Sequence, residues 1–247
     1  MTSGNGILAQ LVRLWRCGWD GLATLERSME TSPGPRILLT GFEPFGGDVL
    51  NPSGLVCRAL HGQRVAQALV HAVELPCVFG RALQALDEAL AATSPVLVVA
   101  LGLAAGRAEI SVERVAINVD DARIPDNSGA QPVDVPVVED GPAAWFSTLP
   151  VKAIVAALHE AGLPGAVSQT AGTFVCNHVF YGLQHRLAGS AVRSGFVHVP
   201  LLAEQADVYP GYPTLALDEL VRGVRIVLEV GLTHMGRDLA LGAGAVA

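Results

Sequence analysis

The run of six apolar residues from Val96 to Leu101 constrains the fold of this chain more than any other feature of its sequence. A strand that is apolar on both faces must be covered on both sides, as parallel strands in α/β proteins are. Other short apolar runs, beginning near Ile37, alternate with segments of helical periodicity, among them a helix capped by Ser53 and a last helix from about Thr214 to Val230. Parallel neighbours need such crossovers. We therefore predict an α/β fold in a single domain, with a mostly parallel twisted sheet flanked by helices on both faces (an α/β/α sandwich).

The two ends of the chain differ from this regular middle part. A mildly amphipathic stretch leads into the breaker-rich segment from Thr31 to Pro35, so we interpret residues 1–35 as an appendage. The folded domain is expected over residues 36–235, with a C-terminal tail at 236–247. We also expect residues 1–28 to be dispensable, because Met29 offers a second start close to the domain.

Charge and hydropathy exclude two classes of partner. Only 16% of the residues are charged and the formal net charge is -7, so the chain has no basic stripe to neutralise nucleic-acid phosphates. Every apolar run ends well short of the roughly 18 residues that a membrane-spanning helix needs. Arg13 and Arg16 interrupt the apolar patch near the N-terminus, which disfavours a secretory signal. These features predict a cytoplasmic protein that binds neither nucleic acid nor membrane.

The spacing of the cysteines and histidines favours neither a metal nor a disulfide framework. The chain has four cysteines, at positions that form no CxxC pair: Cys17, Cys57, Cys77 and Cys176. Reduced thiols are expected, and Cys17 and Cys57 are interpreted as inert core residues. The 7 histidines include no HExxH motif, and the glycine-rich loop from Gly41 to Gly47 lacks the G-K-[ST] of a phosphate loop. We predict no metal, nucleotide or other cofactor.

Four segments carry residues that are suited to catalysis. They are the Gly41 loop, Ser111 to Asn118, Thr170 to Asn177, and Gly195 to Pro200, and each follows or ends a predicted strand, where open α/β sheets place their ligands. Small residues before Cys176 predict a sharp turn that puts this thiol near a helix N-terminus. The helix dipole and free N–H groups there would stabilise a thiolate and offer oxyanion donors. Taken alone, a residue such as His198 in an apolar strand is more often a hydrogen-bonded core histidine, and one such as Glu113 beside Arg114 is more often a solvated surface carboxylate.

Several motifs, in collinear order from Arg36 to the last helix, resemble those of one known family. They are Ile37 to Gly47 (ILLTGFEPFGG), Asn51 to Ser53 (NPS), Glu113 to Asn118 (ERVAIN), Ala122 to Asn127 (ARIPDN), Gly129 to Pro132 (GAQP), Thr170 to Tyr181 around Cys176, and Gly195 to Pro200 with Glu204-Gln205 after it. Together they resemble the pyroglutamyl peptidase I (pyrrolidone-carboxylate peptidase) family of cysteine peptidases. A collinear set of this extent is far more specific than one short motif.

The resemblance implies a catalytic triad of Cys176, His198 and Glu113. In this reading His198 takes the thiol proton, while Glu113 orients and supports the imidazolium. Cys176 attacks the carbonyl that follows pyroglutamate, and backbone N–H groups and Arg123 hold the oxyanion. An acyl-thioester intermediate and a homo-oligomer, dimer or tetramer, are also implied.

The implied substrates are peptides that begin with pyroglutamate, whose lactam carries no charge. Apolar walls with a few hydrogen bonds therefore suffice for binding, where an ordinary aminopeptidase must hold an ammonium. By resemblance the pocket is formed by Phe42, Phe45, Asn51, Ile124, Phe174 and Val175. Plain core packing is the alternative for Phe42 and Phe45.

Two departures from the family pattern leave a second function open. Leu103 replaces a glutamine in the usual Gly-Gln-Ala-Gly-Gly-Arg, and Cys77 replaces a threonine. The family pattern puts Leu103 beside the lactam pocket, so the alternative is a related hydrolase of another N-blocked or lactam substrate. A non-catalytic binding module with the same fold is a third reading. It is disfavoured because the three triad residues are all present.

Overall fold

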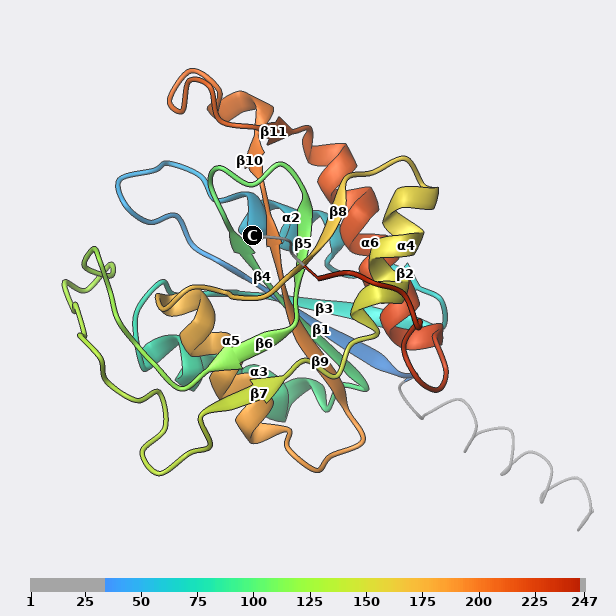
Figure 1. Ribbon diagram of the computed structural model, residues 1–247, viewed down its shortest axis with the longest axis horizontal. Coiled ribbons are helices and arrows are strands. Elements are labelled where there is room, and N and C mark those ends of the chain that lie inside the picture. Colours follow the sequence, from blue (N-terminus) through green and yellow to red (C-terminus); the bar gives the residue numbers. More distant parts are fainter. Residues whose placement is uncertain (1–33, 245–247) are drawn as a thin grey trace, which may run out of the picture. The chain divides into compact units, whose positions relative to one another are not determined.

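The computed structural model describes residues 34–244, so the expectations for residues 1–33, among them Cys17 and Met29, lie outside the described part. At its centre is a seven-stranded sheet in the order β2-β3-β1-β4-β9-β5-β8 (Figure 1). Its strands are β1 (Arg36–Phe42), β2 (Arg64–Val65), β3 (Ala68–Leu75), β4 (Leu97–Leu103), β5 (Ile110–Glu113), β8 (Gly165–Ser168) and β9 (Arg193–Val199).

Most neighbouring strands are parallel, as the sequence predicts. The exceptions are β2 against β3 and β5 against β9. Because β8 pairs in parallel with β5, both of these strands run opposite to β1, β3, β4 and β9. Of the strands that carry or precede the four candidate segments, β1 and β9 therefore run in one direction, and β5 and β8 run in the other.

Helices cover both faces of the sheet and enclose two apolar clusters (Figure 1). On one face lie α2 (Pro52–Leu60), α4 (Val151–Glu160) and α6 (Leu217–Thr233); on the other lie α3 (Arg81–Thr93) and α5 (Val175–Arg186). The run beginning at Val96 explains the arrangement: Leu97, Val99 and Leu101 of β4 belong to the first cluster, and Val98 and Ala100 to the second. The predicted α/β/α sandwich is confirmed.

The start of α2 differs from the sequence expectation. Asn51, not Ser53, is the capping residue, and its Oδ1 accepts hydrogen bonds from the backbone N (3.1 Å) and the Oγ (2.8 Å) of Ser53. Pro52 occupies the first turn, where its missing N–H costs nothing. Ser53 Oγ instead accepts from the backbone N–H of Phe42 at 3.0 Å and ties the helix to the end of β1.

Two small ladders lie outside the main sheet. β6 (Val115–Ile117) pairs antiparallel with β7 (Ala144–Phe146), and β10 (Leu201–Leu202) pairs in parallel with β11 (Thr214–Leu215). A short 3-10 helix follows β10 at Ala203–Gln205. No helix among residues 34–244 is long and apolar enough to cross a membrane.

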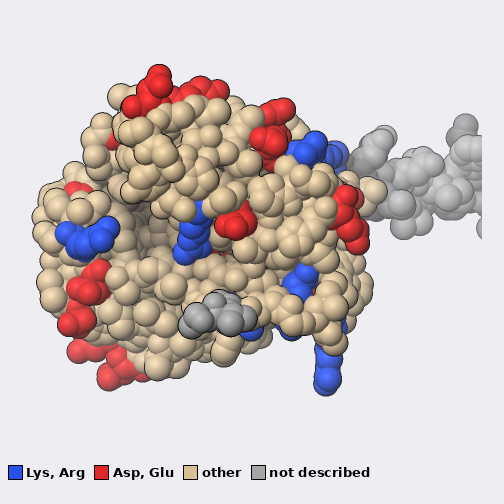
Figure 2. Space-filling view, turned by 45° about the horizontal axis from the view of Figure 1, so that its top comes forward, with Lys and Arg blue, Asp and Glu red and all other residues tan. Residues whose placement is uncertain are grey.

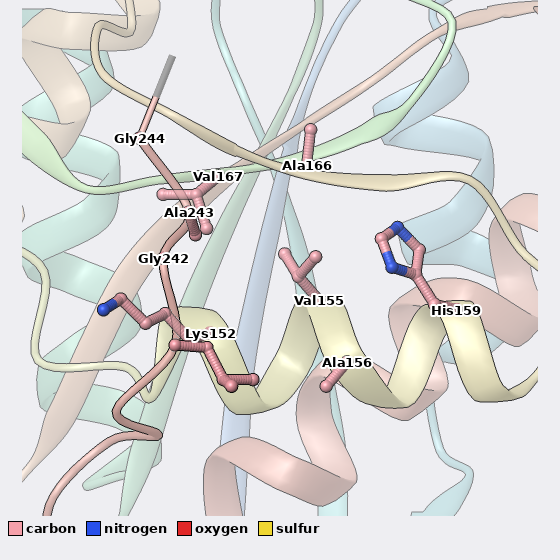
Figure 3. Close-up of a pocket in the computed structure, with 10 residues that line it drawn as sticks. Lys152, Val155, Ala156, His159, Ala166, Val167, Gly242, Ala243 and Gly244 are labelled. Carbon is pink, nitrogen blue, oxygen red and sulfur yellow. The ribbon is translucent and has the colours of Figure 1, made fainter. Parts of the chain in front are cut away.

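The described part of the C-terminal tail, residues 236–244, contacts the domain. The Asp238 carboxylate accepts from the backbone N–H groups of Lys152 (2.9 Å) and Ala153 (3.0 Å) in the first turn of α4. The N-cap residue of α4 itself, Pro150, forms no side-chain hydrogen bond to these N–H groups. The tail passes beside α4 and β8, and the three together line a pocket of about 480 Å³ (Figure 3).

Candidate active site

Cys176 is the second residue of α5, which begins at Val175 after Phe174. The first backbone N–H groups of a helix have no intrahelical acceptor. In α5 the first that finds one is that of His178, which donates to the Phe174 carbonyl at 3.1 Å. The half-buried thiol thus lies at the positive end of the helix, beside N–H groups that are available to an oxyanion.

Gly102 makes room for this thiol on the sheet. A Cβ atom placed on Gly102 would lie 2.8 Å from Cys176 Sγ and 2.8 Å from the Phe196 ring. In the β4–β9 register, Gly102 is the direct partner of His198. The thiol therefore rests against the strand position that neighbours the predicted base, and the glycine is what allows that approach.

His198 and Glu113 are hydrogen-bonded and buried. The distance from His198 Nδ1 to Glu113 Oε1 is 2.7 Å, and Glu113 is 0% exposed. Because the carboxylate accepts, Nδ1 carries the proton and Nε2 is left as the acceptor for a thiol proton. The direction of β5 explains the burial of Glu113. β5 runs antiparallel to β9 with Ser111 opposite His198, so Glu113, two residues later, lies further toward the middle of β9.

Arg107 ends the segment Gly102–Arg107, where it matches the arginine of the usual family pattern, and the sequence analysis assigned it no role. Its Nη1 donates to Glu113 Oε1 at 2.7 Å and to Ser168 Oγ at 3.2 Å, and its Nη2 donates to the Thr170 carbonyl at 3.0 Å. Glu113 Oε1 is therefore shared between His198 and Arg107. A loop arginine with no periodic context gives no sequence signal for such a contact.

Burial keeps both reacting groups uncharged at rest. It raises the pKa of the Cys176 thiol, and the nearby Cys77 and Glu113 raise it further, while Arg107 acts in the opposite direction. Burial also lowers the pKa of His198, against the effect of its hydrogen bond to Glu113. A neutral thiol and a neutral imidazole are the consequence, so a proton must move when the thiol attacks.

Glu43 joins three loops around the site. Its Oε1 accepts from the backbone N–H of Cys77 (3.0 Å) and from Asn127 Nδ2 (2.8 Å), and its backbone carbonyl accepts from Asn51 Nδ2 (3.1 Å). Asn51 thus holds the loop after β1 in place and caps α2 at the same time. Sequence reasoning did not single out Glu43.

Two residues predicted for the substrate pocket and the arginine predicted for the oxyanion line one pocket of the structure. Arg123, Ile124 and Phe174 line a pocket of about 670 Å³ together with Asp121, Gly172 and Thr173. Phe174 packs against Phe45 with ring centroids 6.1 Å apart and edge-on against Phe79 at 5.4 Å. Phe79 was missed by sequence reasoning, although its place after a strand end is typical of a pocket residue.

Three residues that the sequence analysis placed at the pocket have more buried or more distant side chains than a pocket wall would need. Phe42 is the last residue of β1 and 2% exposed, packed near Phe196, and Val175 is 0% exposed, so both side chains lie in the core. Leu103 follows Gly102 on β4, and strand alternation places its side chain on the sheet face opposite to Cys176. It is not a wall of the site.

Among residues 34–244 no cluster of three or more His, Cys, Asp or Glu side chains is suited to holding a metal ion.

The two other described thiols lie in different surroundings. Cys57 on α2 is buried in the apolar cluster on the face opposite to α5, and burial raises its pKa strongly. It has the environment of an inert core thiol. Cys77, by contrast, belongs to the same apolar cluster as Cys176, and burial raises the pKa of its thiol to about 12.

Known proteins are similar to this chain in sequence and fold. A sequence model of the family described as Pyroglutamyl peptidase matches residues 35–234. The pyrrolidone-carboxylate peptidase of Cupriavidus taiwanensis is 59% identical over 202 residues, covering 81% of this chain and 94% of that protein, and that of Escherichia fergusonii is 54% identical over 210 residues, covering 85% and 98%. The crystal structure of pyroglutamyl peptidase I from Bacillus amyloliquefaciens has a TM-score of 0.81 and 40% identity, with 84% of this chain and 99% of that chain covered. This chain belongs to the pyroglutamyl peptidase family.

Proposed function

We propose that this protein is a cysteine peptidase that hydrolyses the bond after an N-terminal pyroglutamyl residue, through Cys176, His198 and Glu113. The observation that carries the proposal is the 2.7 Å hydrogen bond between His198 Nδ1 and the buried Glu113 carboxylate. His198 is the strand partner of Gly102, against which the Cys176 thiol rests at the start of α5. Family membership supplies the substrate class.

The reaction proceeds in two halves. The Cys176 thiol gives its proton to His198 Nε2 while Sγ bonds to the pyroglutamyl carbonyl carbon, and the N–H groups at the start of α5 hold the oxyanion. The C–N bond then breaks as His198 protonates the leaving amine. Water attacks the resulting thioester, its proton passes to His198, and pyroglutamate leaves with the thiol restored. Glu113 supports the imidazolium in both halves.

The hollow that Ile124 and Phe174 line suits the lactam ring, with Phe45 packed behind Phe174. An uncharged ring needs no carboxylate to bind it. Arg123 lies exposed at the same pocket and is positioned to meet the oxyanion or the carbonyl groups of the following residues. On the face shown in Figure 2, acidic and basic side chains are interspersed on a largely uncharged surface, which suits short peptides better than nucleic acid.

The alternative, a hydrolase of another N-blocked substrate, loses its main support because Leu103 lies on the opposite face of the sheet. Cys77 remains as the one departure near the thiol. A binding module without chemistry would have no use for a buried carboxylate–imidazole pair, whose charge is costly to desolvate.

Release of an arylamine from pyroglutamyl, prolyl and alanyl arylamides tests the proposal. We expect hydrolysis of the pyroglutamyl compound alone, loss of activity in Cys176→Ala and Cys176→Ser, and full activity in the control Cys57→Ala. Iodoacetamide should label Cys176 first and stop the reaction. Equal rates on all three arylamides, or more than a few per cent of wild-type activity in Cys176→Ala, would refute the proposal.

Three broader properties belong to the same proposal. A thiol that must stay reduced favours a reducing compartment, so we place the protein in the cytoplasm. We further propose a homo-oligomer, dimer or tetramer, and a peptidase domain at residues 36–235 that suffices for activity. Cell fractionation, light scattering after gel filtration and assay of the isolated domain test these statements in turn.

A further inference from the structure

The guanidinium of Arg107 joins three segments that the active site needs. It contacts Glu113 at the end of β5, Ser168 at the end of β8 and the carbonyl of Thr170, which begins the loop leading to Cys176 six residues later. Its own loop turns sharply after β4, with Arg107 N donating to the Ala104 carbonyl at 3.2 Å. One side chain thereby fixes the distance between the acid that orients the base and the loop that carries the nucleophile.

This ion pair differs from an ordinary surface pair in its burial. Exposed pairs such as Arg58–Glu74, with side chains 63% and 37% exposed, contribute little to stability because water screens their charges. Here the carboxylate is 0% exposed and the guanidinium 29%. Glu113 Oε2 has no hydrogen-bond partner among the described residues, so Oε1 carries both contacts.

We propose that Arg107 is a positioning residue of the active site, which holds Glu113 and the Thr170 turn in place and puts a permanent positive charge on the same carboxylate oxygen that His198 uses. This inference rests on the proposed function, because it assigns Arg107 a part in the same reaction. It adds a residue to the site that lies outside the triad and outside the substrate pocket.

The sign of the charge effect follows from the groups around the thiol. Those that act on Cys176 are Cys77 from the loop after β3, Glu113 from β5 and Arg107 from the loop after β4, with His198 on β9 as its neighbour. Arg107 is the permanent cation of this set. It lowers the pKa of Cys176 and also that of His198. Removing the cation should therefore raise both pKa values.

Three variants test the proposal: Arg107→Gln, which removes the charge; Arg107→Lys, which keeps it but loses the fork that reaches Thr170; and Arg58→Gln, the matched control at an exposed pair. The first measurement is the rate of iodoacetamide modification of Cys176 against pH, without substrate. The second is kcat/KM on a pyroglutamyl arylamide against pH, with thermal unfolding recorded for each variant.

In Arg107→Gln we expect the alkylation profile and the acidic limb of kcat/KM to move up by roughly 0.5 to 1 pH unit, and alkylation at neutral pH to slow about 3- to 10-fold. kcat/KM should fall about 10- to 100-fold, the usual effect of losing a group that orients an active-site ligand. Arg107→Lys should keep the wild-type alkylation profile but lose about 3- to 10-fold in kcat/KM. Arg58→Gln should change neither.

An unshifted alkylation profile in folded Arg107→Gln overturns the electrostatic part of the proposal, and wild-type kcat/KM in Arg107→Lys overturns the positional part. The second test stands even if Arg107→Gln fails to fold. A wild-type protein that cleaves no pyroglutamyl bond would refute the proposed function alone, because alkylation needs no substrate and the profile of Arg107→Gln would still decide the electrostatic part of the proposal.

Discussion

Replacing Gly102 by alanine should misplace the nucleophile while leaving the triad residues themselves untouched. The new Cβ would stand 2.8 Å from Cys176 Sγ and 2.8 Å from Phe196 Cζ, where ordinary contacts begin at 3.4 Å. Phe196 is 0% exposed and packs between Phe42 and Phe180, with ring centroids 6.5 and 5.8 Å away, so the ring has little room to retreat. The thiol must therefore move.

The size of the effect follows from that displacement. Overpacking of a filled core costs about 1 to 3 kcal/mol. For a domain of this size each kcal/mol lowers Tm by roughly 2 to 4 °C. A displacement of the order of 1 Å at a reacting atom costs about 100-fold in rate. We therefore expect Gly102→Ala to lower kcat about 100-fold with a moderate fall in Tm.

The matched control is Gly165→Ala on β8, where a Cβ would lie 2.9 Å from Leu158 Cδ1 beneath α4, on the face opposite to the thiol. It should lower Tm by a similar amount and leave kcat unchanged. Steady-state kinetics on a pyroglutamyl arylamide, the rate of iodoacetamide modification of Cys176, and calorimetry measure the three quantities. A kcat within threefold of wild type in folded Gly102→Ala would show that the thiol does not depend on this glycine.

Three further predictions concern the edges of the site and the domain. Leu103→Gln should leave KM for a pyroglutamyl arylamide within twofold of wild type, because the side chain lies on the opposite sheet face; a several-fold lower KM would restore it to the pocket. Asp238→Ala should lower Tm by roughly 2 to 4 °C in calorimetry at unchanged kcat, since it removes the acceptor for Lys152 and Ala153, a cap worth about 1 kcal/mol; an unchanged Tm would show that the tail does not stabilise α4. A chain that starts at Met29 should match the full chain in kcat and Tm, and a loss of several degrees would contradict the proposed domain boundary.

Strong periodicity made most of the fold predictable. The β4 run and the apolar stripe of α6 each specify an element by themselves, because the burial they demand is encoded in consecutive residues. The direction of β5 is not encoded in that way. A strand of four residues can pair either way, and β5 runs antiparallel to β9 because of where the chain enters the sheet. The direction of β5 decides whether Glu113 is buried. Because that direction could not be predicted, the surroundings of the Glu113 carboxylate could not be predicted either.

The site was predictable to the extent that its signals are local. The small residues before Cys176 predict a turn and a helix N-terminus, and α5 begins there, at Val175. The pairing of His198 with Glu113 spans 85 residues, and only the family resemblance suggested it. Arg107 matches the last residue of the family pattern for its loop, but nothing in the sequence indicated its partners, since these are set by tertiary closure. Gly102 had a weak one, because a glycine inside a buried strand indicates close approach of another group.

The shared carboxylate suggests why the site carries Arg107 beside its triad. A carboxylate that acted on His198 alone would stabilise the imidazolium strongly, and a stable imidazolium is a poor acid when the amine leaves. Arg107 takes part of the charge of Glu113 and so moderates this stabilisation, while the start of α5 and the same guanidinium both favour the thiolate. Acylation and deacylation both use His198, so a base tuned for only one of them would slow the other.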